Sequence, residues 1–445
     1  MLTRRQLAAL PLAAAAPARR RPDIVLFLAD DLGSADLSSY GAPDIRTPNI
    51  DRIGEHGVRF TQCYSNGPEC SPTRTALLTG RYQQRVGGLE CAIGVGNVGR
   101  YDEAVWLQQR GELGLPATEI TLPRILKDAG YDTGCFGKWH LGYLPKFLPR
   151  RHGFDEYFGI LGGNADYFTH REEDGRLTLY QNESPVERRG HSTDLFADEA
   201  IAWLKRRTDK PYFLYLPFTA PHTPIQDPAG MDSKTGTAPW RNRERPVYAK
   251  MVEHMDARIA TVLDQVRKLG REENTIVLFL SDNGADPNGN NGALRGRKSS
   301  LWEGGIRVPC LMRWPARLKA GGTVRQLAMT MDLTPTLLGA AGAAARAKFD
   351  GVDLMPSLTG KRPDFARTVF WRYKRAQERR KCVREGDLKL VIDGAQEELH
   401  DLAADGREER NLLAERKTEA DALRKKLDAW ERDVQAPRLS GFRPV

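Results

Sequence analysis

Four short apolar runs in this chain each stop at a cluster of polar residues, and this pattern constrains the fold more strongly than any other feature. The runs cover residues 24–28, 131–136, 212–216 and 275–280. Amphipathic segments separate the runs, and such alternation predicts a largely parallel sheet with helices on both faces. The predicted fold class is therefore α/β, with a large, mostly parallel sheet sandwiched by helices.

The polar clusters at the ends of these runs indicate a functional site. Ligands of open α/β sheets bind beyond the carboxyl ends of the strands, so the clusters are expected to meet at one edge. A single cluster has an ordinary interpretation as turn chemistry, whereas four at the same relative position favour a site. The side chains brought together in this way are Asp30, Asp31, Lys138, His140, His222, Asp282 and Asn283.

Part of this set suggests a metal ion. Three carboxylates and an amide suit a hard cation such as Ca²⁺ or Mg²⁺, whereas zinc prefers histidine or cysteine. Neighbouring carboxylates at a buried edge repel one another, so a cation between them would be stabilising. The alternative for the first two residues is a solvated strand end. The candidate ligands are Asp30, Asp31, Asp282 and Asn283.

A candidate nucleophile lies at the start of a predicted helix over residues 70–80. Ser71 is expected to cap this helix, and Pro72 suits its first turn. Cys70 would then lie beside the positive end of the helix dipole, which favours a thiolate. Taken without its flanking residues, a lone cysteine is more simply interpreted as a small buried hydrophobic residue.

The residues around Cys70 resemble the maturation signature of the formylglycine-dependent sulfatases, which belong to the alkaline phosphatase superfamily. The match consists of Cys70-x-Pro72-x-Arg74 followed by Leu78-Thr79-Gly80, with Thr73 where the commonest form has serine. The resemblance covers residues 23–412 and is closest to arylsulfatases and N-acetylgalactosamine-sulfatase-like enzymes. The other clusters follow in the family's order, namely Asp30-Asp31, 137–140, His222, 281–284, and Lys298 ahead of 303–309.

The resemblance implies a sulfuric ester hydrolase of the arylsulfatase type that removes sulfate from a sulfated carbohydrate. A separate maturation enzyme would oxidise Cys70 to formylglycine, whose hydrate carries two hydroxyl groups. One hydroxyl would attack sulfur and expel the alcohol. The second would then collapse to the aldehyde and release sulfate, which divides one difficult hydrolysis into two steps.

The resemblance also implies the metal and its ligands. Ca²⁺ is preferred to Mg²⁺ as the ion that stabilises the developing charge. Asp282 would additionally help to deprotonate the attacking hydroxyl. The implied ligands are Asp30, Asp31, Asp282, Asn283 and the modified side chain of Cys70.

The remaining implied roles concern the sulfate group and proton transfer. Arg74 would orient the hydrated side chain, and Lys138 and Lys298 would bind sulfate oxygens. His140 would assist deprotonation of the second hydroxyl. His222 would bind sulfate and protonate the leaving alcohol, which is work suited to imidazole. From composition alone, Lys298 would be read as a surface lysine in a basic loop.

Residues 1–18 predict an export signal that is removed from the mature protein. Arg4 and Arg5 precede a short apolar stretch, and residues 16–18 form an Ala-Pro-Ala cleavage candidate. The adjacent arginines resemble a twin-arginine signal, which predicts delivery by the export machinery to a bacterial periplasm, with secretion as the alternative. No apolar run reaches the roughly 18 residues of a membrane-spanning helix, so no transmembrane span is predicted.

The charge balance is compatible with an acidic partner. The chain carries 67 Lys and Arg against 58 Asp and Glu, a formal net charge of +9. Nucleic acid, anionic lipid and an acidic substrate all fit such a surplus. The sequence shows no known nucleic-acid-binding module, so a sulfated polyanion is favoured and nucleic acid is not predicted. Six cysteines without a C-x-x-C pair argue against a thiolate zinc site.

The pattern changes beyond residue 350, where a smaller unit is predicted. Short strands are expected around 369–373 and 382–392, followed by an amphipathic helix over 415–434. This end resembles the carboxyl-terminal subdomain of sulfatases, an antiparallel sheet with a packed helix. The basic run at 372–381 is interpreted as a solvated face. The predicted organisation is a catalytic α/β domain over 22–360 and a smaller α+β subdomain over 361–445.

Several residues outside the main clusters have weaker assignments. Asp166 and His170 have the spacing of a zinc pair but follow no clear strand, so a structural role is preferred. His152 and His254 are interpreted as structural or solvated. A substrate subsite in loops near the family motifs is predicted from His191, Asn97, Arg295 and Trp302.

Two other functions compete with the sulfatase hypothesis. The first is a phosphoester or phosphonate hydrolase on the same scaffold. Phosphatases of this superfamily use two zinc ions and typically have histidine where this chain has Asn283, so the oxygen-only cluster argues against this alternative. The second is a polyanion-binding protein that is inactive because Cys70 stays a thiol.

Overall fold

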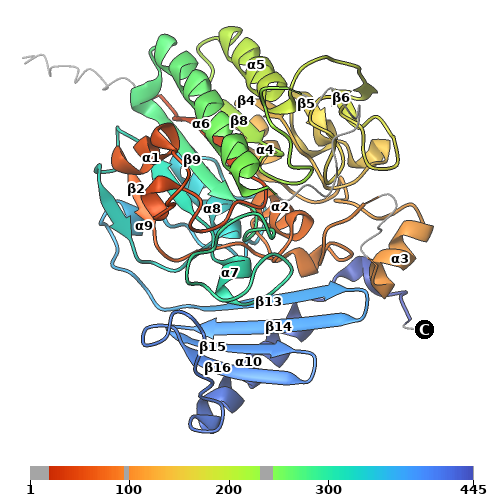
Figure 1. The fold of residues 1–445 in the computed structure, drawn as a ribbon, viewed down its shortest axis with the longest axis vertical. Coiled ribbons are helices and arrows are strands. Elements are labelled where there is room, and N and C mark those ends of the chain that lie inside the picture. The colour runs from red at the N-terminus through yellow and green to blue at the C-terminus, as the bar shows by residue number, and fades with distance from the viewer. Residues whose placement is uncertain (1–19, 95–99, 231–243, 444–445) are drawn as a thin grey trace, which may run out of the picture.

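The computed structural model describes residues 20–94, 100–230 and 244–443 of the chain. These residues form a large sheet with helices on both faces and a smaller carboxyl-terminal sheet backed by one helix (Figure 1). The predicted α/β fold class, including the smaller second sheet, is confirmed. The predicted leader at 1–18 and Asn97 lie outside the described residues.

Parallel strands form the middle of the large sheet. Its ten strands run in the order β11-β2-β10-β9-β1-β8-β4-β5-β6-β7, and the neighbours from β9 to β5 pair in parallel. The four apolar runs of the sequence are four adjacent strands of this set. These four strands are Thr275–Ser281 (β9), Asp23–Ala29 (β1), Tyr212–Pro217 (β8) and Asp132–Phe136 (β4), and the fifth parallel strand is Glu156–Ile160 (β5).

Short strands complete the sheet at both edges. β10 pairs antiparallel with β9 and β2, and β6 pairs antiparallel with β5 and β7, whereas β11 is parallel to β2. The sequence does not predict these strands, because each is too short to show a hydrophobic period. They are Val58–Phe60 (β2), Leu179–Gln181 (β6), Ser184–Pro185 (β7), Cys310–Arg313 (β10) and Gly322–Val324 (β11), with a separate parallel pair Cys63–Tyr64 (β3) and Ala328–Met329 (β12).

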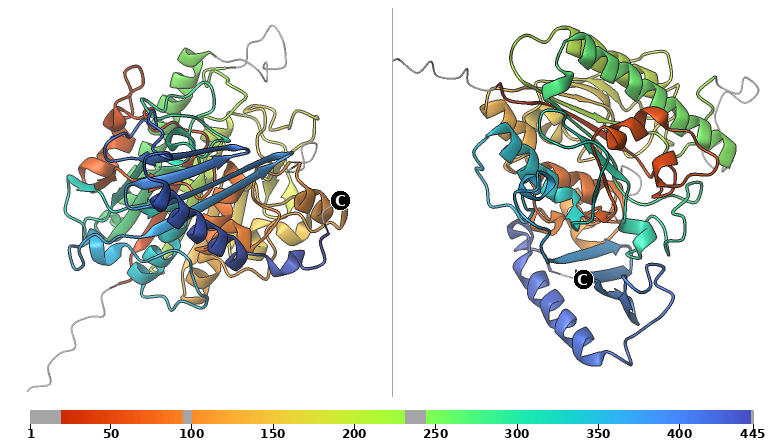
Figure 2. Two further views of the ribbon diagram at one scale, coloured as in Figure 1. Left: turned by 90° about the horizontal axis from the view of Figure 1, so that it is seen from below. Right: turned by 90° about the vertical axis from the view of Figure 1, so that its left-hand side faces the viewer.

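The central strands divide their side chains between two hydrophobic cores. In β1, Leu26 and Leu28 belong to one core and Val25 and Phe27 to the other, as the alternation along a strand requires. Helices cover both faces, as Figure 2 shows. Pro48–Glu55 (α1), Ser192–Lys205 (α5) and Arg245–Lys268 (α6) cover the second core, and Cys70–Thr79 (α2), Leu122–Asp128 (α4) and Leu333–Ala341 (α8) cover the first. The remaining helices are Asp102–Gln109 (α3), Glu303–Ile306 (α7) and Met355–Leu358 (α9).

The carboxyl-terminal sheet is antiparallel and has four strands in sequence order. The stretch predicted as one strand at 382–392 contains two strands, because Gly386 turns the chain with a φ of 58°. The last strand is not predicted by the sequence, whereas the helix is close to its predicted bounds. The elements are Thr368–Arg375 (β13), Glu378–Glu385 (β14), Leu388–Asp393 (β15), Gln396–Asp401 (β16) and Lys417–Asp433 (α10).

The basic run at 372–381 is not a solvated face, so that prediction is wrong for its first half. Arg372 forms an ion pair with Glu90 at 2.7 Å, and Lys374 forms one with Glu103 at 2.5 Å. These acidic partners belong to the α/β part of the chain, and the basic residues belong to β13. The charges therefore attach the small sheet to the loop that holds Glu90 and to α3 (Asp102–Gln109), a long-range pairing that composition does not reveal.

No helix among the described residues is long and apolar enough to cross a membrane. The predicted domain boundary at 360 and 361 falls in the segment between α9 and β13. The division of the chain into two domains at that boundary stays a prediction.

Candidate active site

The carboxyl ends of the central strands bring the predicted clusters together. Asp30 and Asp31 follow β1, and Asp282 follows β9, its neighbour in the sheet. Backbone hydrogen bonds join these ends, since the Asp30 amide donates to the Ala220 carbonyl and the Asp282 amide donates to the Ala29 carbonyl, each at 3.1 Å. The expectation that these strand ends meet at one edge is confirmed.

Two residues of the clusters adopt a backbone conformation that side chains other than glycine rarely take. Asp31 has a φ of 62° and His140 has a φ of 57°. Left-handed backbone at a non-glycine residue is strained and persists where the surrounding structure fixes it. Strained backbone of this kind is common at functional sites. Here the left-handed conformation directs both side chains into the same region.

α2 begins at Cys70, and its N-cap is Glu69 rather than Ser71. The prediction of Ser71 as the cap is therefore wrong. The Ser71 hydroxyl instead donates to the His140 carbonyl at 2.9 Å and accepts from the Ile93 amide at 3.2 Å. Contacts with distant loops thus replace the local capping bond that the sequence favours.

The Cys70 side chain lies between the carboxylate of Asp30 and the ammonium group of Lys138. Its Sγ donates to Asp30 Oδ1 at 3.3 Å and lies 3.3 Å from Lys138 Nζ. Burial of the thiol, followed by the charge of Asp30, raises the pKa of Cys70 well above its usual value. The expectation of a thiolate is therefore wrong, because these two effects outweigh the helix dipole.

The oxygen-rich cluster is compact but not identical to the predicted ligand set. Ligand atoms of Asp30, Asp31, Cys70 and His222 all lie within 4.8 Å of one another. Asp282 is turned towards Arg74, which donates to its Oδ2 from Nε at 3.0 Å and from Nη2 at 2.8 Å. His222 thus joins the cluster, and Asp282 lies beside it, with its Oδ1 accepting from the Asp31 amide at 3.2 Å.

Asn283 provides the test of whether the site fits a hard cation. Its Nδ2 donates to Asp31 Oδ1 at 2.7 Å. Its Oδ1 is buried and has no hydrogen-bond partner among the described residues. Buried polar atoms are normally paired, and an amide oxygen beside a carboxylate is a ligand that calcium uses. The residues present therefore fit a calcium ion.

Each carboxylate at this edge of the sheet lies against a cation, and Arg74 is the one that pairs with Asp282. Lys138 Nζ lies 2.5 Å from Asp30 Oδ2, and Lys298 Nζ lies 2.6 Å from Asp31 Oδ2. Burial alone would raise the pKa of Asp31, but Lys298 and then His222 hold it well below its usual range. Buried carboxylates of this kind stay charged only because cations lie against them.

The two histidines of the clusters differ in their hydrogen bonds. His140 Nε2 lies 2.5 Å from the Ile93 carbonyl, and its Nδ1 is buried without a partner among the described residues. Burial and the charge of Lys138 hold the pKa of His140 well below its usual value. Because a neutral ring donates from Nε2 to that carbonyl, Nδ1 is left as an acceptor.

His222 is also neutral in this arrangement. Its Nδ1 donates to the Thr223 carbonyl at 2.7 Å, so its Nε2 accepts from Lys298 Nζ at 3.1 Å. Burial, followed by the charge of Lys298, lowers the pKa of His222 to about 4. A bound anion beside Nε2 would favour the protonated ring.

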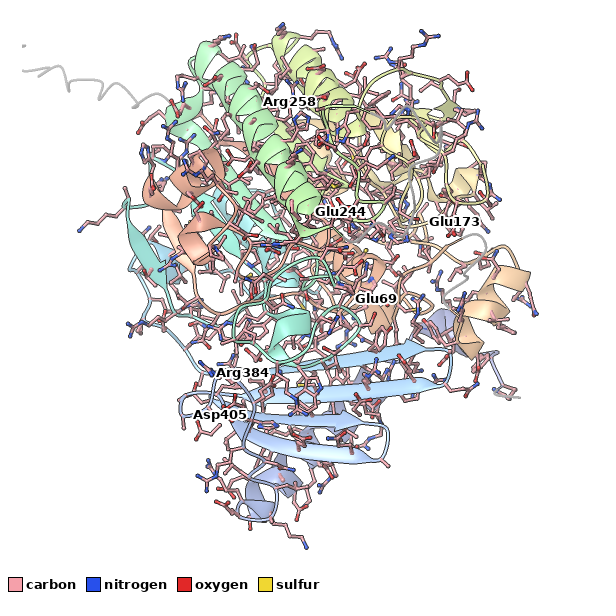
Figure 3. All side chains as sticks on the ribbon, in the orientation of Figure 1. Glu69, Glu173, Glu244, Arg258, Arg384 and Asp405 are labelled. Carbon is pink, nitrogen blue, oxygen red and sulfur yellow. The ribbon has the colours of Figure 1, made fainter. Side chains whose placement is uncertain are left out.

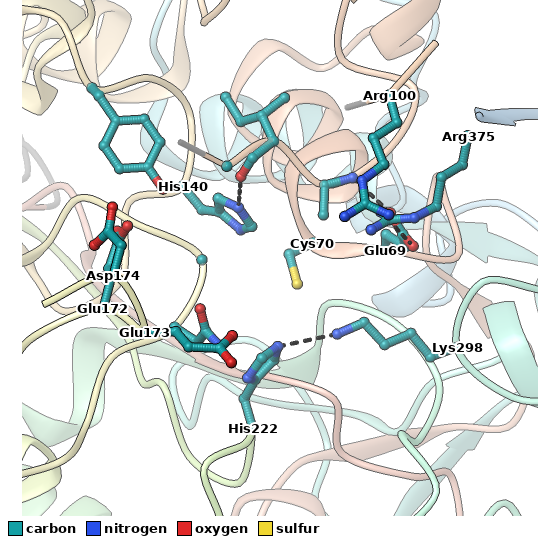
Figure 4. A pocket seen from close by; sticks show the side chains of 16 residues that line it. Glu69, Cys70, Arg100, His140, Glu172, Glu173, Asp174, His222, Lys298 and Arg375 are labelled. Atoms are coloured by element: carbon teal, nitrogen blue, oxygen red, sulfur yellow. Dashed lines mark hydrogen bonds and ion pairs between the residues drawn. The ribbon is translucent and has the colours of Figure 1, made fainter. Parts of the chain in front are cut away.

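These groups open onto a cavity of about 600 Å³. Cys70 points into the cavity between His140, His222 and Lys298 (Figure 4). The wall beside Lys298 is formed by Glu69, Arg100 and Arg375, and the opposite wall is formed by Glu172, Glu173 and Asp174. Cys70, His140, His222 and Lys298 form the floor of the cavity, which suits the anionic group of an ester. The walls carry both acidic and basic side chains.

Sequence reasoning missed the wall residues, and Glu69 shows why. Its buried carboxylate accepts from the Ser299 hydroxyl at 2.6 Å, from the Tyr373 hydroxyl at 2.9 Å and from Arg375 Nη1 at 3.0 Å. Figure 3 shows Glu69 between α2 and the small sheet. These bonds tie the residue before Cys70 to the residue after Lys298 and to β13, and no local pattern signals such distant partners.

The predicted substrate subsite is wrong for its three described members, none of which lines the cavity. His191 stacks on Tyr167, with ring centroids 4.9 Å apart. Arg295 lies over the ring of Trp302, with 3.6 Å between its guanidinium carbon and the ring centroid. These side chains pack against neighbouring elements, which proximity in sequence to the motifs does not reveal.

Asp166 and His170 have structural partners, in line with the role preferred from the sequence. Asp166 accepts from the Phe168 and Thr169 amides, at 3.0 and 2.7 Å, and from Gln226 Nε2 at 2.8 Å. His170 Nε2 lies 3.1 Å from the Gly190 carbonyl. The two side chains stabilise the loops that surround them.

The arrangement of a buried cysteine, an oxygen-rich cluster and three cations at one sheet edge is that of an enzyme acting on an anionic ester. Residues 22–343 match the family described as Sulfatase, and residues 296–433 match the one described as N-sulphoglucosamine sulphohydrolase, C-terminal. The chain therefore belongs to the sulfatase family, and it is a sulfatase enzyme.

Individual relatives show the extent of the similarity. The dog N-acetylgalactosamine-6-sulfatase is 36% identical over 367 residues, which cover 78% of this chain and 67% of that protein. Human arylsulfatase A is 33% identical over 389 residues, which cover 80% and 71%. The solved structure of Ps i-CgsB in complex with k-i-k-neocarrahexaose superposes with a TM-score of 0.83 at 29% identity, covering 94% of each chain.

Proposed function

We propose that this sulfatase removes sulfate from a sulfated carbohydrate with a formylglycine nucleophile made from Cys70. The observation that carries the proposal is the position of the Cys70 side chain. It lies on the cavity floor, against Lys138 and beside the oxygen-rich cluster. A buried, protonated thiol is a poor nucleophile, which favours its conversion by a separate maturation enzyme over direct use.

The proposed reaction begins with the hydrated aldehyde of residue 70. One hydroxyl attacks sulfur, and the bond between sulfur and the alcohol oxygen breaks. The sulfate is then held as an ester of residue 70. Loss of a proton from the second hydroxyl restores the aldehyde and releases sulfate, and water hydrates the aldehyde for the next cycle. The covalent intermediate divides the hydrolysis into two steps, and each step has a lower barrier than direct hydrolysis.

The surrounding side chains supply charge and proton transfer. Lys138 and Lys298 flank the position of Cys70 and bind the sulfate oxygens, which carry the developing charge. Arg74 holds Asp282, which assists deprotonation of the attacking hydroxyl. The free Nδ1 of His140 accepts the proton of the second hydroxyl, and His222, beside Lys298 Nζ, protonates the departing alcohol.

Calcium is the proposed ion of the cluster, and Mg²⁺ fits less well because it demands a more regular geometry. When bound, it would polarise a sulfate oxygen and offset the charge of the transition state. The unsatisfied amide oxygen of Asn283 and the neighbouring carboxylates support this assignment. The proposed ligands are Asp30, Asp31, Asp282, Asn283 and the modified side chain of residue 70.

The substrate class rests on the relatives and on the cavity. N-acetylgalactosamine-6-sulfatase and the Ps i-CgsB complex with k-i-k-neocarrahexaose both point to sulfated sugars. The cavity walls carry carboxylates and guanidinium groups, which bind hydroxyl groups through hydrogen bonds. We further propose that the leader at 1–18 directs export, so that the export machinery and the maturation enzyme are the expected partners.

A comparison of aryl sulfate and aryl phosphate tests the reaction class. The carboxylates of the oxygen-rich cluster and Asn283 favour sulfate, so we expect kcat/KM for the aryl sulfate to exceed that for the aryl phosphate by at least about a hundredfold, since that ratio measures differential transition-state binding. The measurement uses one matured preparation and the same aryl leaving group. A preference for phosphate would establish the phosphoester hydrolase alternative instead.

A further inference from the structure

A second cluster of metal-binding side chains lies apart from the cavity, where α5 meets α6. His191 and Asp194 stand three residues apart at the start of α5, and His254 lies on α6. Figure 1 shows these two helices side by side over the large sheet. Ligand atoms of the three side chains lie within 4.8 Å of one another. None of the three has a role in the proposed reaction.

The ring nitrogens of His191 are the unsatisfied polar atoms of this cluster. Both ring nitrogens of His191 are buried and have no hydrogen-bond partner in the described part of the chain, and the residue is 3% exposed. His254 Nε2 and Arg258 Nε are buried as well, and they lie 3.0 and 3.3 Å from Asp194 Oδ1. Buried polar groups are nearly always paired in native proteins, so the two unpaired nitrogens of His191 indicate a missing ligand.

We propose that His191, Asp194 and His254 bind a zinc ion. Two imidazoles and one carboxylate are a common zinc ligand set, and a water molecule would complete the tetrahedron. His254 Nε2 already lies 3.0 Å from Asp194 Oδ1. That separation suits two ligands of one ion, because zinc ligands at about 2.0–2.2 Å from the metal lie a little over 3 Å apart.

The ligand chemistry separates this site from the oxygen-rich cluster at the cavity floor. Imidazole nitrogen suits zinc, whereas carboxylate and amide oxygens suit calcium. The carboxylate of Asp194 is partly exposed, with 34% of its side chain accessible. An ion from solvent can therefore reach the cluster, although His191 is buried.

The proposed ion would also support a loop of the active site. His191 stacks on Tyr167 with an interplanar angle of 17°. The Tyr167 hydroxyl lies 2.9 Å from the carbonyls of Thr219 and His222. A metal bond that fixes the His191 ring therefore fixes the surface against which Tyr167 packs. The role of the ion is structural, since it binds no group that takes part in the reaction.

Arg258 competes with the proposed zinc ion for the carboxylate of Asp194. Its Nε lies 3.3 Å from Asp194 Oδ1, and its Nη2 forms an ion pair with Asp198. Figure 3 shows Arg258 on α6. The guanidinium neutralises Asp194 when no metal is bound, and Asp198 remains as its partner when zinc takes Asp194. Removal of the guanidinium should therefore tighten zinc binding.

The test measures zinc binding to the full chain rather than activity. Metal-stripped protein is titrated with Zn²⁺ in millimolar calcium, which keeps the oxygen-rich cluster occupied, and bound zinc is counted by mass spectrometry of the metal after dialysis. We expect one zinc per chain and a higher melting temperature. His254→Ala and the nearly isosteric Asp194→Asn should each weaken binding at least about a hundredfold, more than loss of an outer contact does.

Two further variants sharpen the result. Arg258→Gln is expected to tighten zinc binding several-fold, whereas His56→Ala, which removes an exposed histidine at the end of α1, should leave it unchanged. Equal zinc binding by the wild type, His254→Ala and Asp194→Asn would overturn the proposal. The absence of zinc binding by the wild type at millimolar free zinc would overturn it too.

Discussion

Cys70→Ala is expected to abolish hydrolysis of an aryl sulfate, with kcat lowered by at least about 10⁴-fold, as when a covalent nucleophile is removed. The substitution removes the thiol whose oxidative loss turns the β-carbon of residue 70 into the aldehyde carbon, and it leaves no nucleophile on the cavity floor. Alanine is smaller than the buried thiol and continues α2, so the fold is expected to persist. The measurement is initial-rate kinetics on protein made together with the maturation enzyme.

Cys382→Ala is the matched control for this prediction. Cys382 is a fully buried thiol in β14, far in sequence from the cluster, and it does not line the cavity. Its replacement is expected to leave aryl sulfate turnover close to that of the wild type. If Cys70→Ala retained more than a tenth of the wild-type rate under the same conditions, the nucleophile assigned here would be wrong.

Asp31→Asn is expected to lower kcat/KM by about a thousandfold, the scale at which lost charge stabilisation is felt in catalysis. The Asp31 carboxylate binds Lys298 Nζ at 2.6 Å and Asn283 Nδ2 at 2.7 Å, and it belongs to the proposed calcium ligands. The substitution conserves volume but removes the charge that holds the ion. In the wild type a chelator should abolish turnover and calcium should restore it. The residual turnover of the variant should respond to neither.

Asp36→Asn is the control for Asp31→Asn. It distinguishes the loss of a calcium ligand from the loss of a buried carboxylate outside the proposed ligand set. Asp36 is buried, and its Oδ2 accepts from Tyr248 and from the Gly33 and Asn290 amides, at 2.7, 3.0 and 2.9 Å. Its replacement is expected to lower stability while the response to calcium stays that of the wild type. A calcium dependence of Asp31→Asn equal to that of the wild type would exclude Asp31 as a ligand.

The central strands could be predicted from the sequence because their signal is local. The run at 275–280 is apolar from residue 276 to residue 280, as expected of a strand buried on both faces, and the polar residues after it mark its end. The edge strands carry no such signal, since β10 has four residues and β7 has two. Their position follows from pairing with β9 and β6, which is a long-range property.

The candidate site was predictable in its residues but less so in its chemical state. The motif around Cys70 identifies the side chain, but its protonation depends on burial and on Asp30, which is 40 residues away. The partners of Glu69 are more distant still, because Arg375 lies 306 residues further along the chain. Local sequence patterns identify the side chains of the site. Their protonation and hydrogen-bond partners depend on tertiary contacts, which those patterns do not contain.

Mass spectrometry of one peptide tests the central claim most directly. Trypsin releases residues 60–74, a peptide that contains both Cys63 and Cys70, so Cys63 serves as an internal control. The digest is made from a preparation whose aryl sulfate turnover has been measured. We predict an aldehyde at position 70 and an alkylated thiol at position 63, with the aldehyde fraction proportional to activity. Alkylated thiols at both positions in a fully active preparation would contradict the account.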